Sequence, residues 1–140
     1  MKAFVTGVGG QLGYDVINEL KRRGHEAFGT DITESADIKL DITDRAAVDK
    51  ALCDIRPDAV IHCAAWTAVD AAEDDENRGK VYAVNVTGTR NIAEVCKQLD
   101  CKMIYISTDY VFNGQGMEPW QANCKDFAPL NYYGQTKLER

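Results

Sequence analysis

Two side chains near the end of the sequence have the types and the spacing needed to move a proton. Tyr133 and Lys137 are four residues apart, and positions i and i+4 share one face of an α-helix. An isolated tyrosine has a pKa of about 10, which is too high for easy proton exchange at neutral pH. A nearby ammonium group favours the phenolate and lowers that pKa. The spacing alone is common by chance and is also typical of a structural pair on a helix.

A hydroxyl group earlier in the chain makes this pair more specific. Ser107-Thr108-Asp109 follows an apolar segment, residues 102–106, that is typical of a β-strand. Ligands bind where the carboxyl ends of parallel strands meet, so we expect Thr108 at that edge, beside Tyr133. There its hydroxyl could hydrogen-bond a substrate carbonyl.

A glycine-rich loop lies between the first predicted strand and the first predicted helix. Its spacing is G-x-x-G-x-x-G at Gly7, Gly10 and Gly13, because Leu12 stands where G-x-G-x-x-G would need glycine. Glycines permit a tight turn and close approach of a phosphate to the backbone. The free N–H groups at the helix start attract a pyrophosphate. A turn with only a packing role is the alternative, but the strand–loop–helix context favours a dinucleotide site.

Two aspartates follow at positions suited to the adenosine half of a dinucleotide. Asp31 ends the second predicted strand, where a carboxylate can accept hydrogen bonds from the ribose. It would repel a 2′-phosphate, so this rule favours NAD over NADP; a solvated turn aspartate is the alternative. Asp41 and Ile42 could flank the adenine. Asp41 is equally suited to cap the next helix, and both interpretations stay open.

Strand-like and helical segments alternate along the chain. The predicted strands cover residues 2–6, 26–30, 59–64 and 102–107, and the predicted helices cover 12–20, 41–55, about 78–99 and from 131 or 132 onward. This alternation predicts an α/β fold, a Rossmann-type doubly wound parallel sheet with helices on both faces. We expect one domain over residues 1–140, truncated within its last predicted helix, with a C-terminal substrate domain absent from this chain.

Composition and charge narrow the classes of partner. The 140 residues are 45% hydrophobic and 27% charged, as in a soluble globular protein. The net charge of -6 disfavours nucleic acid and anionic membranes as main partners. With no signal peptide and no membrane-length apolar run, we expect a cytoplasmic protein.

The cysteines predict neither disulfides nor a metal site. The five are an odd number, none form a C-x-x-C pair, and only two histidines are present. We expect reduced, mostly buried thiols.

Four segments together resemble one family of enzymes. The glycine loop, residues 64–70 (AAWTAVD), residues 107–112 (STDYVF) and residues 129–139 (PLNYYGQTKLE) are similar to the dTDP-4-dehydrorhamnose reductases, which are extended short-chain dehydrogenases. The resemblance covers the whole chain. It implies hydride transfer from NADPH, often also NADH, to the 4-keto group of dTDP-4-dehydro-L-rhamnose. The product, dTDP-L-rhamnose, is a precursor of cell-surface polysaccharide.

The resemblance also implies roles for individual residues. Tyr133 would donate the proton, Lys137 would orient the cofactor and tune Tyr133, and Thr108 would polarise the keto group. Thr108 and Asp109 match substrate-contacting positions. The implied cofactor-binding residues are Gly7, Gly10, Gln11, Leu12, Gly13, Asp31, Asp41, Ile42, Ala65, Trp66, Thr67, Ile106, Tyr133 and Lys137.

Length is the main departure from the family, whose members are roughly twice as long. Because their C-terminal part supplies most of the sugar-nucleotide pocket, we expect the isolated fragment to be inactive. The resemblance implies a homodimer for the full-length protein. Some members bind magnesium at a dimer contact, but the matching segment is not in this chain, so no metal is predicted here.

Two other functions fit the same residues. One is another nucleotide-sugar epimerase or dehydratase of the extended short-chain dehydrogenases, which share the nucleotide site and the Tyr-Lys pair. The other is a non-catalytic, NADP-binding regulatory subunit of methionine adenosyltransferase. The complete Thr108, Tyr133 and Lys137 set favours an enzyme.

Overall fold

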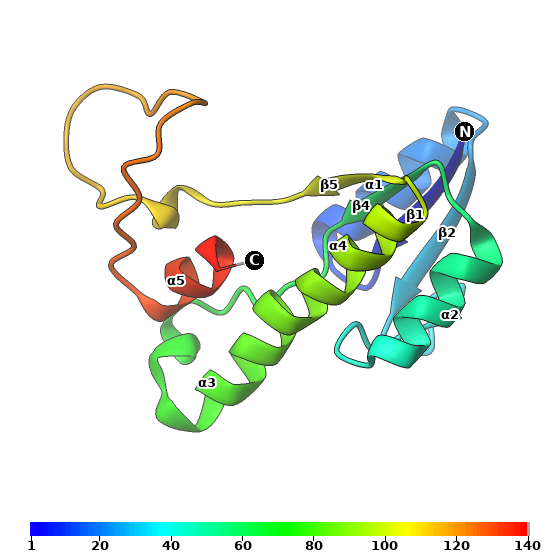
Figure 1. The fold of residues 1–140 in the computed structure, drawn as a ribbon, viewed down its shortest axis with the longest axis horizontal. Coiled ribbons are helices and arrows are strands. Elements are labelled where there is room, and N and C mark those ends of the chain that lie inside the picture. The colour runs from blue at the N-terminus through cyan, green and yellow to red at the C-terminus, as the bar shows by residue number, and fades with distance from the viewer. Residues whose placement is uncertain (140) are drawn as a thin grey trace.

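A five-stranded parallel sheet organises the chain (Figure 1). The computed structural model describes residues 1–139. The strand order is β3-β2-β1-β4-β5, and each neighbouring pair is parallel. The strands are β1 (Lys2–Thr6), β2 (Glu26–Asp31), β3 (Ile38–Lys39), β4 (Ala59–His62) and β5 (Lys102–Tyr105). Because the strands are parallel, the carboxyl ends of β1, β2, β4 and β5 lie at one edge of the sheet. The loops that follow these strands line the candidate site there.

Helices connect the strands and cover the sheet. The α-helices are α1 (Gln11–Arg22), α2 (Arg45–Ile55), α3 (Asp75–Tyr82), α4 (Thr89–Gln98) and α5 (Tyr132–Leu138). Short 3-10 turns, η1 (Asp70–Glu73) and η3 (Asp109–Val111), flank the site, and a π-helical segment, η2 (Ala83–Gly88), joins α3 to α4. The predicted helix over residues 78–99 is therefore three consecutive segments.

The main core lies between the sheet and the pair α2 and α4, which Figure 1 shows in front of the strands. Phe4 and Val60 from the sheet are fully buried against Leu52 of α2 and Ile92 of α4. Neighbouring strand residues point to the other face, and α1 packs against β1 and β2. The predicted doubly wound arrangement is confirmed.

Two local features differ from the sequence analysis: α2 begins at Arg45 rather than at residue 41, which leaves only the adenine interpretation of Asp41 open, and β3 is an additional strand. The N-cap of α2 is Asp44, whose side chain accepts a hydrogen bond from the Ala47 backbone N–H at 3.1 Å. Asp41 lies one turn earlier, and its carboxylate accepts from the Thr43 N–H and hydroxyl instead. The two-residue strand β3 was not predicted, because so short a segment carries no periodicity.

The cysteines are free, but they are not mostly buried as expected. Only Cys96 is buried; Cys53 is exposed, and Cys63, Cys101 and Cys124 are half-buried. Within residues 1–139, no group of three or more His, Cys, Asp and Glu side chains could hold a metal ion. No helix in the same residues is both long and apolar enough to cross a membrane.

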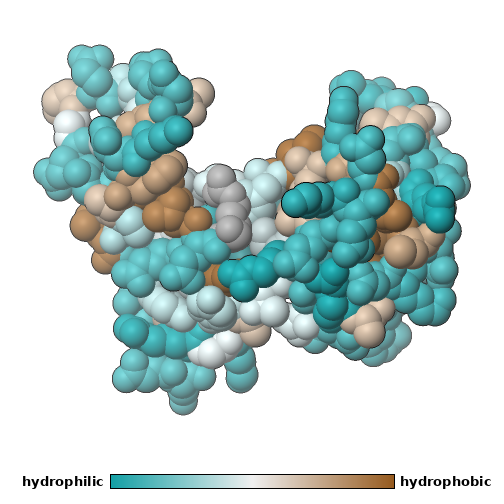
Figure 2. Space-filling view, in the orientation of Figure 1, coloured by the Kyte–Doolittle hydropathy of each residue, from teal (hydrophilic) through white to brown (hydrophobic). Residues whose placement is uncertain are grey.

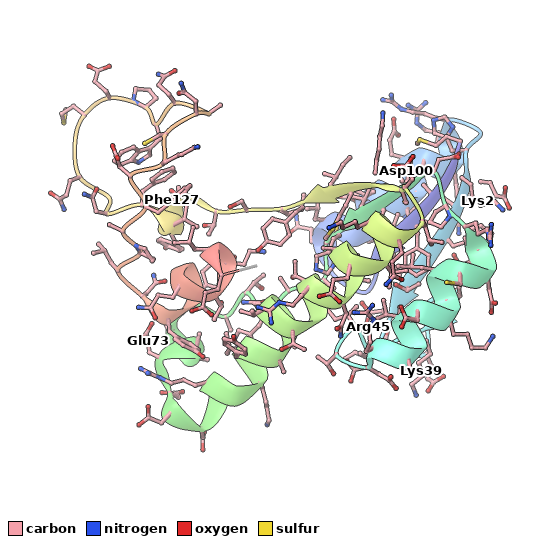
Figure 3. All side chains as sticks on the ribbon, in the orientation of Figure 1. Lys2, Lys39, Arg45, Glu73, Asp100 and Phe127 are labelled. Atoms are coloured by element: carbon pink, nitrogen blue, oxygen red, sulfur yellow. The ribbon has the colours of Figure 1, made fainter. Side chains whose placement is uncertain are left out.

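The loop around residues 112–128 lies at the opposite end of the molecule from strands β1 and β2 (Figure 1). Figure 2 shows a mainly hydrophilic face that is hollowed between the sheet and the loop around residues 112–128. Rings of that loop stack on one another, with Phe112 and Trp120 centroids 4.4 Å apart. Figure 3 shows Phe127 in this loop and Glu73 below α5. Glu73 accepts a hydrogen bond from the Tyr132 backbone N–H at 2.6 Å, which joins η1 to the start of α5.

Candidate active site

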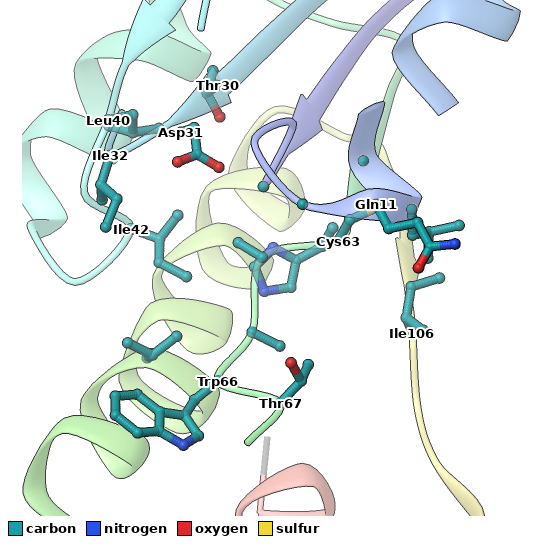
Figure 4. Close-up of a pocket in the computed structure, with 18 of the residues that line it drawn as sticks. Gln11, Thr30, Asp31, Ile32, Leu40, Ile42, Cys63, Trp66, Thr67 and Ile106 are labelled. Atoms are coloured by element: carbon teal, nitrogen blue, oxygen red, sulfur yellow. The ribbon is translucent and has the colours of Figure 1, made fainter. Parts of the chain in front are cut away.

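A cavity of about 630 Å³ lies at the carboxyl ends of the strands (Figure 4). Every residue that the sequence assigned to cofactor binding lines it. In Figure 4, Asp31 and Ile42 border one side, Gln11 and Ile106 the other, and Trp66 lies at the far end. The structure adds nine lining residues that sequence reasoning missed, namely Asp15, Thr30, Ile32, Leu40, His62, Cys63, Ala64, Val84 and Ser107.

The glycine loop closes tightly on its neighbours. Gly7 has a φ of 73°, and a Cβ there would lie 2.6 Å from the Ala64 backbone nitrogen. A Cβ on Gly13 would lie 2.1 Å from the Gly7 carbonyl oxygen. The first turn of α1 therefore packs directly against the loop. Because its N-cap is Gly10, no side chain caps this helix start, which suits a phosphate group.

Asp31 lies beside this loop at the end of β2. One carboxylate oxygen accepts a hydrogen bond from the Gly9 N–H at 3.0 Å, and the other accepts from the Thr33 N–H at 3.1 Å. A Cβ on Gly9 would lie 3.0 Å from that carboxylate. Gly9 was not singled out because it falls outside the three-glycine spacing. Its hydrogen bond to Asp31, 22 positions away in the sequence, shows that Gly9 contacts the end of β2.

The Tyr133–Lys137 pair lies on one short helix facing the cavity. The Asn131 side chain caps α5 by accepting from the Gly134 N–H at 2.7 Å. Tyr133 is 8% exposed and Lys137 is 4% exposed. A Cβ on Gly134 would lie 2.3 Å from the Tyr110 carbonyl oxygen, so α5 packs closely on η3. The expected helix and the shared face are confirmed.

In the chain by itself, the pKa of Tyr133 is raised above its ordinary value. Burial raises the pKa of Tyr133, and Tyr110 and Asp109 raise it further. The Tyr110 ring lies edge-on, 6.1 Å from the Tyr133 ring. A partly buried phenol beside a carboxylate resists ionisation, so these neighbours keep the proton on Tyr133.

Thr108 and Asp109 lie in an adjoining hollow of about 530 Å³. Ser107 lines both this hollow and the main cavity. The Thr108 hydroxyl accepts a hydrogen bond from the Tyr110 N–H and donates one to the Asp109 carboxylate, each at 3.2 Å. Thr108 is therefore a lining residue of the adjoining hollow, whereas Tyr133 and Lys137 line the main cavity.

Asn85, which sequence reasoning missed, ties two walls of the site together. It is 1% exposed within the π-helical segment η2. Its amide oxygen accepts from the Trp66 N–H at 2.8 Å, and its amide nitrogen donates to the Thr136 hydroxyl at 3.0 Å. One amide therefore fixes the loop after β4 relative to the Tyr-Lys helix. Segments of π-helix are frequent at functional sites.

The strand order and the glycine loop at its carboxyl edge define a Rossmann-type fold. The chain belongs to the family described as the RmlD substrate binding domain, whose model matches residues 1–140. The resemblance to dTDP-4-dehydrorhamnose reductases is thereby confirmed.

Several similar proteins are named dTDP-4-dehydrorhamnose reductase. The dTDP-4-dehydrorhamnose reductase of Streptomyces griseus is 41% identical over 133 residues, which are 95% of this chain and 41% of that protein. The crystal structure of such a reductase from Clostridium acetobutylicum has a TM-score of 0.88 at 39% identity and is matched over 99% of this chain and 47% of its own.

A reductase structure from Bacillus anthracis, in complex with NADP, has the same TM-score at 38% identity, over 99% of this chain and 47% of its own. The chain therefore spans less than half the length of these relatives.

Proposed function

We propose that this chain is the nucleotide-binding part of a reductase that converts dTDP-4-dehydro-L-rhamnose to dTDP-L-rhamnose with NAD(P)H. The observation that carries the proposal is one continuous cavity bounded by the glycine loop, Asp31, Tyr133 and Lys137. Relatives named as dTDP-4-dehydrorhamnose reductases support the substrate. A relative named as a spore coat polysaccharide biosynthesis protein, from Bacillus subtilis, supports the polysaccharide pathway.

The cavity has the donors that a dinucleotide needs. The uncapped start of α1 would hold the pyrophosphate, because its backbone N–H groups and dipole favour anions. Asp31 would accept from the adenosine ribose, with Asp41 and Ile42 near the adenine. The bound cofactor supplies the hydride. Lys137, Ile106 and Tyr133 line the same cavity, and in this proposal the nicotinamide end lies beside Tyr133.

The proton would come from Tyr133. Because burial and Asp109 raise the pKa of Tyr133, the phenol is protonated at neutral pH and can act as a general acid. Thr108 would hydrogen-bond the developing alkoxide from the adjoining hollow. Lys137 would bind the cofactor ribose and favour the phenolate that remains after proton transfer.

The cofactor could be NADH or NADPH. The Asp31 carboxylate borders the cavity, and its charge would repel a 2′-phosphate. The Bacillus anthracis relative, however, binds NADP. The proposal therefore includes both cofactors.

The proposal extends to the whole protein. A C-terminal domain would complete the sugar-nucleotide pocket, the enzyme would act in the cytoplasm, and two copies would form a dimer. Net consumption of NAD(P)H separates this reductase from an epimerase or dehydratase, which regenerates its cofactor.

Replacing Tyr133 with Phe in the full-length protein tests the proposal. We expect turnover of the dTDP-4-keto sugar, followed by NAD(P)H absorbance, to fall at least a hundredfold, the usual scale for a general acid. Cofactor affinity should stay within a fewfold of wild type. Tyr14→Phe is the matched control, because Tyr14 is 62% exposed. Near-normal turnover of Tyr133→Phe would reject the assigned role.

A further inference from the structure

The stacked rings of His62 and Tyr105, here called the platform, come from neighbouring strands, and His62 lines the cavity. His62 of β4 and Tyr105 of β5 are paired in the sheet register. Their ring centroids are 6.2 Å apart, with planes inclined by 24°. Paired residues on adjacent strands point to the same face, so the two rings lie side by side on it.

The His62 side of the platform is fixed and uncharged. Its Nδ1 hydrogen-bonds the Thr6 hydroxyl at 2.7 Å, and its Nε2 hydrogen-bonds the Thr89 hydroxyl at 3.0 Å. Burial, with a contribution from Lys137, lowers the pKa of His62 to about 4. The imidazole is therefore neutral at neutral pH and adds no second cation beside the ammonium of Lys137.

Tyr105 contacts both ends of Lys137. The ammonium nitrogen lies 4.3 Å from the centre of the Tyr105 ring, within the range of a cation–π interaction. The Tyr105 hydroxyl donates a hydrogen bond to the Lys137 backbone carbonyl at 3.1 Å. One aromatic side chain thus holds the backbone and the charge of the same lysine. A lysine chain has several rotatable bonds, so fixing it removes much rotational freedom.

We propose that Tyr105 is a positioning residue for Lys137. Its ring face keeps the ammonium at the cavity wall, and its hydroxyl fixes the backbone of α5 at the same residue. The proposal rests on the proposed function, because the target of Lys137 is the cofactor ribose. It differs from a general packing role, since it depends on the charge of Lys137 and on the electron-rich face of the ring.

Three substitutions at position 105 separate the hydroxyl, the ring and its electrostatics. In the full-length protein, Tyr105→Leu should weaken NADH or NADPH binding by between about twofold and thirtyfold, which corresponds to the energy range of cation–π contacts. Tyr105→Phe keeps the ring and should recover most of the affinity. Pentafluorophenylalanine at position 105 keeps the shape but reverses the ring's charge distribution, so binding should be as weak as in Tyr105→Leu. Tyr14→Leu, on an exposed side chain, should bind like wild type.

A double-mutant cycle with Lys137→Met then tests the mechanism. If Tyr105 acts through the ammonium, Tyr105→Leu should add almost no further loss of affinity once Lys137 is replaced. Equal losses in both backgrounds, or full affinity with the fluorinated ring, would overturn the proposal. Because the fluorinated and Phe variants preserve the packing, they remain informative if the Leu variant fails to fold. A wild-type protein that binds neither cofactor would instead reject the proposed function itself.

Discussion

The buried ionisable side chains of the site differ in how they are accommodated. Lys137 and His62 are only 4% and 2% exposed. Burial penalises a charge unless partners compensate for lost water. The ammonium of Lys137 lies over the face of the Tyr105 ring, in a cation–π interaction. His62 instead hydrogen-bonds two threonine hydroxyls, which suit a neutral imidazole. The neutral ring can therefore stay buried near a lysine without repulsion.

His62 should make folding stability depend on pH. Its pKa falls from 6.5 to about 4 in the folded chain, so the unfolded chain binds more protons between those values. The free energy of unfolding should therefore fall, by on the order of 3 kcal/mol, as the pH drops from about 6.5 to about 4. Urea unfolding at several pH values measures this loss.

Carboxylates titrate near the lower end of the same range, so the wild-type curve needs a reference. In His62→Gln the pH dependence over this window should be flatter than in wild type. His25→Gln, at a half-buried position outside the site, should keep the wild-type slope. Parallel curves for wild type and His62→Gln would contradict the assignment.

At the scale of elements, close backbone contacts decide which glycines matter. Gly13 in α1 and Gly79 in α3 both lie within helices. A Cβ on Gly13 would meet the Gly7 carbonyl, whereas a Cβ on Gly79 would meet nothing within 4 Å. The two positions therefore form a matched pair for the same substitution.

Gly13→Ala should destabilise the fold by about 1–3 kcal/mol through overpacking and should weaken dinucleotide binding. Gly79→Ala should instead raise stability by about 0.5–1 kcal/mol, because alanine favours an unobstructed helix. Thermal or urea unfolding and a cofactor titration give both values. Equal effects of the two changes would show that the loop tolerates a side chain at position 13.

At the scale of the whole molecule, the proposed cofactor-binding residues and the Tyr133–Lys137 pair line one cavity within residues 1–139. Thr108 and Asp109 line an adjoining hollow, and the relatives are more than twice as long as this chain. Substrate binding should therefore need more protein than cofactor binding does.

We expect the 140-residue chain to bind NADH or NADPH but to show no turnover of dTDP-4-keto sugars. The full-length protein should do both. Nicotinamide fluorescence measures the first property, and loss of NAD(P)H absorbance measures the second. Efficient NADPH-dependent turnover by the short chain would contradict this division.

The sequence alone was sufficient wherever a residue acts through its own type and local spacing. Gly7, Gly10 and Gly13 predicted the tight loop between β1 and α1, and Tyr133 with Lys137 predicted a shared helix face. Alternating apolar segments predicted the parallel sheet. These features need only helix and strand periodicity, which neighbouring residues determine.

Only the tertiary structure decided the features that depend on residues far apart in the chain. Asn85 bonds Trp66 and Thr136 across 19 and 51 positions, and the ring of Tyr105 meets Lys137 only because β5 and α5 fold together. The pKa of Tyr133 rises rather than falls because burial and Asp109 act on it in space. Such effects depend on solvent exclusion and on the distances between charged groups. The spacing of residues along the sequence determines neither of these.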